Sequence, residues 1–172
     1  MSEEKKKCLF VGRFQPFHNG HLMVVSGMAK VCNQVIIAIG SANAEKSLKN
    51  PFTVEQRREM IQRALQSQDL IPKYDISFIE VDDKESDYDW TNQVLELAGD
   101  DVAQVWTGDE WTKKCFQEKE IEVKDIKEVP GISATQVRQL MIEDGDWHLK
   151  VPPEVADYLD TIGGVARVKS LA

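Results

Sequence analysis

The chain has 172 residues, of which 42% are hydrophobic and 29% are charged, and its formal net charge at pH 7 is -8. This length and composition are typical of one soluble globular domain and exclude an intrinsically disordered chain. The negative charge argues against broad electrostatic binding to nucleic acid, so a phosphate-bearing ligand needs a local basic cluster. The candidates for such a cluster are Arg13, Lys46, Lys49, Arg57, Arg58 and Arg138.

The start of the chain and the cysteines indicate a compartment. No apolar run is long enough to span a membrane, and the short charged segment of residues 1–7, which we expect to be flexible, is not a signal peptide. Cys8 and Cys32 lie among apolar neighbours, and the three cysteines lack metal-like spacing. The sequence therefore predicts reduced core cysteines and a cytoplasmic protein without a membrane partner.

Five short β-like runs are separated by helical patterns. The runs are residues 8–12, 35–40, 76–81, 102–107 and 121–126. The second run is apolar at every position from Val35 to Ile39, which is typical of a strand buried on both faces of a parallel sheet. The alternation of strands and helices predicts an α/β fold, with a Rossmann-like five-stranded parallel sheet and helices on both faces.

Residues 132–172 are predicted to be helical and to belong to the same single domain, which spans residues 1–172. Ser133 fits the N-cap of one helix, which residues 144–146 end. A second helix begins at residues 151–154 and ends at Gly163.

Polar side chains follow each predicted strand. Because the carboxyl ends of parallel strands meet at one edge of a sheet, these side chains are expected to gather there. They are Arg13, His18 and His21 after the first strand, Ser41, Asn43 and Lys46 after the second, Asp82 and Asp83 after the third, Gly108 and Asp109 after the fourth, and Ser133, Thr135 and Arg138 after the fifth.

The first strand, its glycine-containing turn and the helix start that follows predict a phosphate site, because the first N–H groups of a helix have no partners. His18 and His21 are three positions apart and share one face of the first helical turn. The alternative is a pair of capping or surface histidines, but the location of two of the three histidines at this turn favours phosphate binding. No third histidine or cysteine accompanies them, which disfavours a metal site. The absence of a Gly-x-Gly-x-x-Gly loop and of a Walker-type loop disfavours dinucleotide redox chemistry and P-loop phosphoryl transfer.

Two segments carry a family resemblance. Residues 18–21, His-Asn-Gly-His, resemble the His-x-Gly-His signature of the nucleotidyltransferase superfamily, and residues 132–138 resemble its Ile-Ser-x-Thr-x-x-Arg signature. Further segments are similar to those of archaeal-type nicotinamide-nucleotide adenylyltransferases, and the similarity extends from Leu9 to Leu171. These segments are residues 12–18, 40–42, 50–53 and 144–147, together with Trp90.

The resemblance implies adenylyl transfer from ATP to nicotinamide mononucleotide, which yields NAD and pyrophosphate with the help of Mg²⁺. It also implies a homo-oligomer, often a hexamer. The ATP-binding residues that it implies are Gly12, Arg13, Phe14, His18, His21, Gly108, Asp109, Ile132, Ser133, Thr135 and Arg138. Of these, Arg13, His18, His21 and Arg138 have catalytic roles, and His21 stabilises charge at the α-phosphate. The acceptor-binding residues that it implies are Ser41, Ala42, Lys49, which meets the mononucleotide phosphate, and Trp90, which stacks on the nicotinamide ring.

Alternatives remain for several residues. Trp90 is alternatively a plain core residue, and Trp106, Trp111 and Trp147 are interpreted as packing residues. The acidic run of residues 82–89 is interpreted as a solvated loop, in which a magnesium role for Asp82 or Asp83 is a weaker alternative. Asp87 and Asp109 stand where the family tends to carry asparagine, and their roles stay open, as do the metal ligands.

Other functions also remain possible from the sequence. The acceptor is alternatively nicotinate mononucleotide, FMN, phosphopantetheine or another small phosphorylated molecule, and the transferred group is alternatively a cytidylyl group. A non-catalytic nucleotide-binding regulator is the alternative from another class. A class I aminoacyl-tRNA synthetase, which has a similar signature, is disfavoured by the length and the negative charge.

Overall fold

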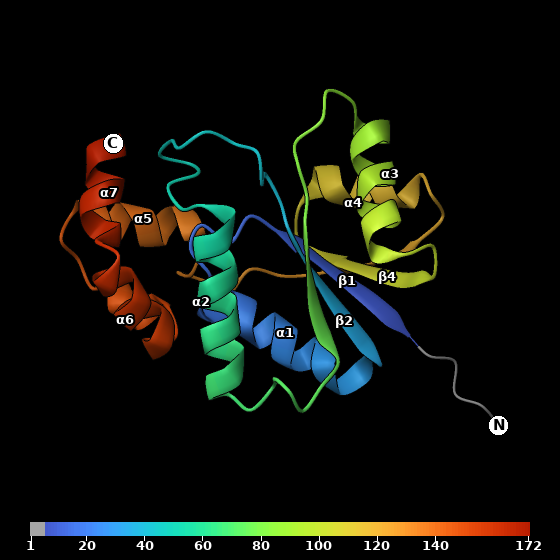
Figure 1. Cartoon of the computed structure of the whole chain (residues 1–172), viewed down its shortest axis with the longest axis horizontal. Coiled ribbons are helices and arrows are strands. Elements are labelled where there is room, and N and C mark those ends of the chain that lie inside the picture. Colours follow the sequence, from blue (N-terminus) through green and yellow to red (C-terminus); the bar gives the residue numbers. More distant parts are fainter. Residues whose placement is uncertain (1–5) are drawn as a thin grey trace.

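The computed structural model describes residues 6–172, and these contain a five-stranded parallel sheet (Figure 1). The strands are β1 (Lys7–Gly12), β2 (Gln34–Ile39), β3 (Ile76–Glu80), β4 (Val102–Thr107) and β5 (Glu122–Asp125). They lie in the order β3-β2-β1-β4-β5, and every neighbouring pair is parallel. The order reverses direction at β1, so the carboxyl ends of β1 and β4 flank the switch point where such sheets bind ligands. The predicted Rossmann-like fold is confirmed.

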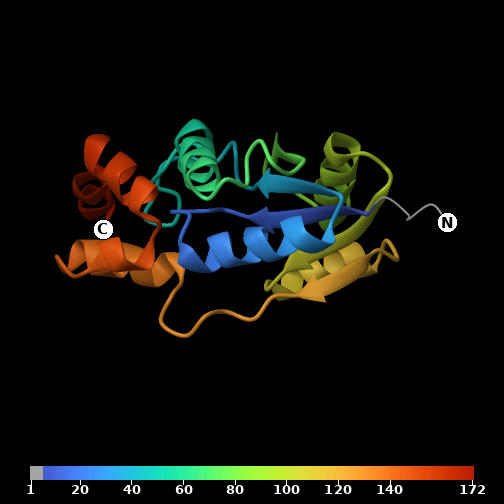
Figure 2. The same ribbon diagram turned by 90° about the horizontal axis from the view of Figure 1, so that it is seen from below.

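Helices cover both faces of the sheet, and Figure 2 shows the blue helix of residues 19–31 running alongside the strands. On one face, Phe10 and Ile37 share a core with α1 (Asn19–Val31) and α2 (Val54–Ser67). On the other face, Leu9 and Ile36 share a core with α3 (Asp87–Ala98) and α4 (Glu110–Gln117). Successive strand residues point to opposite faces, so the continuous apolar run of β2 supplies both cores.

The C-terminal helices pack against the α2 side and gather beside one end of the sheet (Figure 1). They are α5 (Ala134–Ile142), the short 3₁₀ helix η1 (Trp147–Lys150), α6 (Pro153–Thr161) and α7 (Gly164–Leu171). The two predicted helices correspond to α5 and α6. The sequence patterns missed α7, because Gly163 ends α6 in a left-handed conformation, with φ +68°, and the chain then resumes a helix at once.

The start of the chain is more ordered than predicted. Lys7 begins β1, and the main chain of Lys6 bonds to Asn33 and Gln34. The expectation of a flexible segment is therefore wrong at these two residues, whereas residues 1–5 lie outside the described part of the chain.

The structure joins Cys8 and Cys32 in a disulfide, so the prediction that both are reduced is wrong. Helix α1 runs back along β1, and its C-cap residue Cys32 thereby returns to the start of the strand. The two Cα atoms are 6.1 Å apart, which is within disulfide range. Among the described residues Cys115 keeps a free thiol, which is buried between the sheet and α3 and α4.

None of the helices in residues 6–172 combines the length and the apolar character needed to cross a bilayer.

Candidate active site

A cavity of about 450 Å³ opens at the carboxyl ends of β1 and β4. Its walls come from the end of β1, the first turns of α1, the end of β4 and the loop that follows β5. The predicted site residues that line it are His18, His21, Gly108, Asp109 and Ile132. The two signature segments, which are far apart in the sequence, therefore meet at one cavity.

His18 and His21 cap the helix as well as lining this cavity. The N–H of His21 donates to Nδ1 of His18 at 3.3 Å, and the N–H of His18 donates to Nδ1 of His21 at 3.1 Å. The two rings are stacked, with centroids 3.5 Å apart. The pair therefore caps the helix, as the alternative from the sequence predicted, and it also lines the cavity. Both are possible because a capping imidazole keeps its second nitrogen free.

The surroundings keep both imidazoles neutral. Burial lowers the pKa of His18 from 6.5 to about 4. The pKa of His21 is lowered well below its ordinary value, first by burial and second by the charge of His18. Phe14 and Phe17 pack against the His21 ring, with centroids 4.8 and 5.4 Å away. Since each Nδ1 accepts a backbone N–H, each neutral ring carries its proton on Nε2 and offers a neutral N–H donor rather than a cation.

A second cavity, of about 280 Å³, adjoins the first. Val11 and Asp109 line both cavities, so the two meet at the end of β1. The predicted site residues at the second cavity are Gly12, Arg13, Ser41, Trp90 and Asp109, and Asp83 and Trp111 also line it.

The sequence alone predicts a packing role for Trp111, yet this residue lines the second cavity. Its ring lies 4.6 Å from that of Trp90, and it is 42% exposed, whereas Trp90 is only 5% exposed. Its Nε1 donates to Asp87 at 2.9 Å, which connects α4 to the start of α3. The sequence signal that could have indicated this location is the position of Trp111, two residues after Asp109 and shortly after the end of β4.

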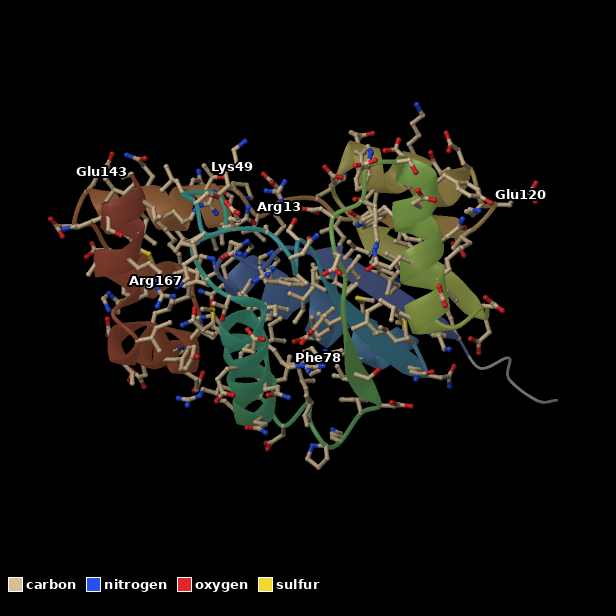
Figure 3. All side chains as sticks on the ribbon, turned by 45° about the horizontal axis from the view of Figure 1, so that its top comes forward. Arg13, Lys49, Phe78, Glu120, Glu143 and Arg167 are labelled. Carbon is tan, nitrogen blue, oxygen red and sulfur yellow. A yellow bond between two sulfur atoms is a disulfide. The ribbon has the colours of Figure 1, made fainter. Side chains whose placement is uncertain are left out.

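A side chain from the loop after β3 holds the turn after β2. Ser41 has a left-handed backbone, with φ 50°, and its hydroxyl donates to Asp83 at 2.9 Å. Ser41 and Ala42 also line a third cavity, of about 210 Å³, together with Lys46. In the described part of the chain Lys49 is exposed and lines none of these three cavities, although it lies on the same side of the molecule as Arg13 (Figure 3).

The second signature supports the site through α5. Ser133 is the N-cap of this helix, as predicted, and accepts the N–H of Gln136 at 3.1 Å. Arg138 donates to the carbonyl of Gln15 at 2.8 Å and to Thr135 Oγ1 at 3.4 Å. Burial, and then the neighbouring charge of Arg13, lower the pKa of Arg138. Two guanidinium groups thus lie near each other at the end of β1, which is an arrangement suited to anions.

Two glycines and a phenylalanine complete the predicted set. A Cβ at Gly108 would lie 2.8 Å from the carbonyl oxygen of Ile126, so the close approach of these loops requires glycine. A Cβ at Gly12 would lie 2.9 Å from the ring of Phe14, which is buried beneath the site rather than lining a cavity.

Acidic side chains near the site do not form a metal cage. Within residues 6–172 no group of three or more His, Cys, Asp or Glu side chains is arranged to hold a metal ion. Asp83 is engaged with Ser41, and Asp109 is the N-cap of α4 and accepts from Thr112. Arg58, one of the predicted basic cluster, pairs with Glu80 at 3.4 Å.

Comparisons with known structures are consistent with this architecture. A bifunctional NMN adenylyltransferase/ADP ribose pyrophosphatase of Francisella tularensis, complexed with AMP and a manganese ion, superposes with a TM-score of 0.74 at 23% identity. The match covers 97% of this chain and 52% of the Francisella protein, so this chain spans about half the length of that protein. A nicotinic acid mononucleotide adenylyltransferase of Plasmodium falciparum, complexed with NaAD, gives a TM-score of 0.69 at 16% identity, over 94% and 98% of the two chains. At these identities the likeness concerns the fold.

Sequence comparisons give the family. The model of the cytidylyltransferase-like family matches residues 9–140. A nicotinamide-nucleotide adenylyltransferase of Thermococcus kodakarensis is 40% identical, over 97% of this chain and 89% of that protein. Proteins of the same name from Pyrococcus furiosus and Picrophilus torridus are 37% and 36% identical, over 97% and 96% of this chain and 89% and 97% of theirs. The chain therefore belongs to the cytidylyltransferase-like family and, within it, to the archaeal-type nicotinamide-nucleotide adenylyltransferases.

Proposed function

We propose that the chain transfers the AMP portion of ATP to nicotinamide mononucleotide, which yields NAD and pyrophosphate. The observation that carries this proposal is the junction of two cavities at Val11 and Asp109. One cavity has the histidine pair and Ile132, and the other has Arg13 and an aromatic wall. A nucleoside triphosphate in the first and a mononucleotide in the second would bring their phosphates together at the end of β1.

The chemistry needs no nucleophile from the protein. An oxygen of the mononucleotide phosphate attacks the α-phosphorus of ATP, the bond from that phosphorus to the bridging oxygen of the β-phosphate breaks, and pyrophosphate leaves. Because the attacking phosphate oxygen is already a competent nucleophile, catalysis consists of positioning and of stabilising the negative charge that spreads during transfer.

The donors of the site suit this task. His18 and His21 offer Nε2–H groups to the ATP phosphates, and His21 is assigned to the α-phosphate. Arg13 lines the second cavity and lies near Arg138, so it is assigned to bridging the phosphates of the two substrates. Neutral donors among aromatic rings bind phosphate without the cost of keeping a cation buried.

The second signature is assigned to the β- and γ-phosphates. The start of α5 has unpaired N–H groups and the positive end of the helix dipole, and Ser133 caps it. Thr135 and Arg138 lie on its first turns. Ile132, Gly108 and Asp109 line the cavity that would hold the nucleoside, whereas Gly12 lines the second cavity with the ring of Phe14 packed behind it.

The second cavity is assigned to the acceptor. Trp90 and the more exposed Trp111 give a surface for the nicotinamide ring, and Ser41 and Ala42 line the turn beside it. Lys49 is kept as the residue that meets the mononucleotide phosphate, since it lies on the same side of the molecule as Arg13 (Figure 3).

A divalent cation, Mg²⁺ in this proposal, accompanies ATP. The absence of a three-ligand cluster in the described residues fits a cation ligated mainly by phosphate oxygens and water, as is usual for Mg²⁺. When bound, it supplies positive charge to the triphosphate.

We further propose that residues 1–172 act as a single domain, within a cytoplasmic homo-oligomer that is a hexamer by family resemblance. A cytoplasmic location follows from the substrates, because charged nucleotides do not cross membranes unaided. The net charge of -8 supports a function without nucleic acid, and no membrane partner is proposed.

A substrate panel tests the function. The protein is incubated with Mg·ATP and, separately, with nicotinamide mononucleotide, nicotinate mononucleotide, FMN and phosphopantetheine, and the products and pyrophosphate are measured. NAD from nicotinamide mononucleotide is the expected product. ATP binding with no pyrophosphate release for any acceptor would instead support a regulator, and light scattering on the same sample gives the oligomeric state.

A further inference from the structure

Arg57 is a fully buried arginine in the first turn of α2. It is 1% exposed, and among the described residues it has the largest of the fully buried side chains. None of the ion pairs within residues 6–172 includes Arg57. A buried guanidinium requires partners for its N–H groups, so the fold must supply them from elsewhere.

The partners are backbone carbonyl groups at the ends of two strands. Nη1 donates to the carbonyl of Arg13 at 2.8 Å and to that of Gly40 at 2.6 Å. Nη2 donates to the carbonyl of Ser41 at 3.3 Å, and Nε donates to the N-cap carbonyl of Thr53 at 3.3 Å. One side chain thereby connects the turn after β1, the turn after β2 and the start of α2.

Two of these carbonyls precede residues with unusual backbones. The peptide of Arg13 is followed by Phe14, with φ 55°, and the peptide of Gly40 is followed by Ser41, with φ 50°. A left-handed backbone is unfavourable for residues other than glycine and persists only where the surroundings enforce it. Nη1 of Arg57 binds the peptide oxygen directly before each of the two left-handed residues.

These two turns form one wall of the second cavity. Arg13, Gly40 and Ser41 all line it, whereas Arg57 does not. Arg57 reaches only the third cavity, with all three of its guanidinium nitrogens already donating to carbonyls. Burial lowers the pKa of Arg57 to about 10, which leaves the group charged at neutral pH.

We propose that Arg57 is a positioning residue, which holds the turns after β1 and β2 in the shape that receives the mononucleotide and does not itself contact substrate. This inference rests on the proposed function, because it assigns the second cavity to the acceptor. The first cavity is lined by neither Gly40 nor Ser41, so the ATP side of the site is expected to depend less on Arg57.

Three variants test this role. Arg57→Met removes the donors at similar length, Arg57→Lys keeps the charge with a smaller set of donors, and Arg63→Met is the control, an exposed arginine on the same helix. The readouts are kcat, the KM for nicotinamide mononucleotide, the KM for ATP and the melting temperature.

For Arg57→Met we expect the KM for the mononucleotide to rise about tenfold to hundredfold, the range given by the loss of hydrogen bonds to a charged group. The KM for ATP should change less than threefold. Arg57→Lys should recover part of the loss, and Arg63→Met should match wild type in kcat and in both KM values.

Equal increases in both KM values, or a lower melting temperature with unchanged KM values, would assign Arg57 to general stability and overturn the proposal. A lysine variant that does not fold would do the same. Failure of the proposed function is distinguishable, because wild type itself would then form no NAD from ATP and nicotinamide mononucleotide.

Discussion

His18 and His21 each accept the other's backbone N–H on Nδ1, at 3.3 and 3.1 Å, and their rings stack 3.5 Å apart. This reciprocal pair closes the first turn of α1 and sets the tautomer of both rings. The same two residues therefore stabilise a helix start and present Nε2–H donors at the cavity, so structure and chemistry are coupled at this turn.

The donor role of His21 is testable by truncation. His21→Ala is expected to lower kcat about 10²–10³-fold, the usual effect of removing one donor to a developing charge. Turnover is measured as pyrophosphate release at saturating substrates, with circular dichroism as a check of the fold. His148→Ala is the control, because His148 is exposed and pairs with Asp160. Near wild-type turnover in a folded His21→Ala protein would contradict the assignment.

The buried His18 makes stability depend on pH. Its pKa is lowered to about 4 by burial, so between pH 6.5 and pH 4 the unfolded chain binds a proton that the folded chain does not. Stability contributed by this group is thus present above pH 6.5 and is lost as the pH falls through that window, by up to about 3 kcal/mol. We expect His18→Gln to flatten this part of the curve in urea unfolding at pH 4.5, 5.5 and 7. If the free energy of unfolding fell equally with pH in the variant and in wild type, this contribution of His18 would be contradicted.

The disulfide between Cys8 and Cys32 closes a loop with a sequence separation of 24. Chain-entropy estimates for such a loop give about 3 kcal/mol of stabilisation. Reduction is therefore expected to lower the melting temperature by roughly 6–12 °C. Thermal unfolding with and without dithiothreitol measures this, and Cys32→Ser should melt at the reduced value in both buffers. The same melting temperature with and without reductant in wild type would contradict the prediction.

The aromatic wall of the second cavity predicts a selective effect on the acceptor. Trp111→Ala is expected to raise the KM for nicotinamide mononucleotide about tenfold, since it removes the more exposed ring of the wall. The KM for ATP should stay near the wild-type value. Tyr88→Ala serves as the control, because Tyr88 is 68% exposed and does not line the cavity. An unchanged acceptor KM would remove Trp111 from the proposed site.

Gly108 is expected to tolerate no side chain. In Gly108→Ala the new Cβ would meet the backbone oxygen of Ile126 at 2.8 Å and displace one wall of the first cavity. The expected result is a KM for ATP raised at least tenfold, by analogy with the 1–3 kcal/mol cost of overpacking. At Gly27, in α1, nothing lies within 4 Å of the added Cβ, so Gly27→Ala should leave the KM unchanged and should not reduce stability. Equal behaviour of the two variants would contradict this reasoning.

Local sequence patterns predicted most of the architecture. The all-apolar run of β2 and the spacing of apolar residues in the helices depend on burial along one element, which periodicity reports directly. The patterns passed over α4 and α7, because α4 is short and follows Asp109 without a long apolar stripe, and α7 begins at Gly164, the second residue of a glycine pair.

By itself, the sequence determined the strand–helix alternation, the convergence of polar residues at one sheet edge and the two signatures that indicate the family, because each is written in neighbouring residues. Only the tertiary structure decided that Cys8 meets Cys32, that Trp111 lines the second cavity, and that Arg57 binds backbone carbonyls. These relationships arise where crossover connections return the chain to an earlier strand, and no local spacing encodes which side chains then face each other. The neutral state of the histidine pair belongs to the same class, since burial among aromatic rings sets it.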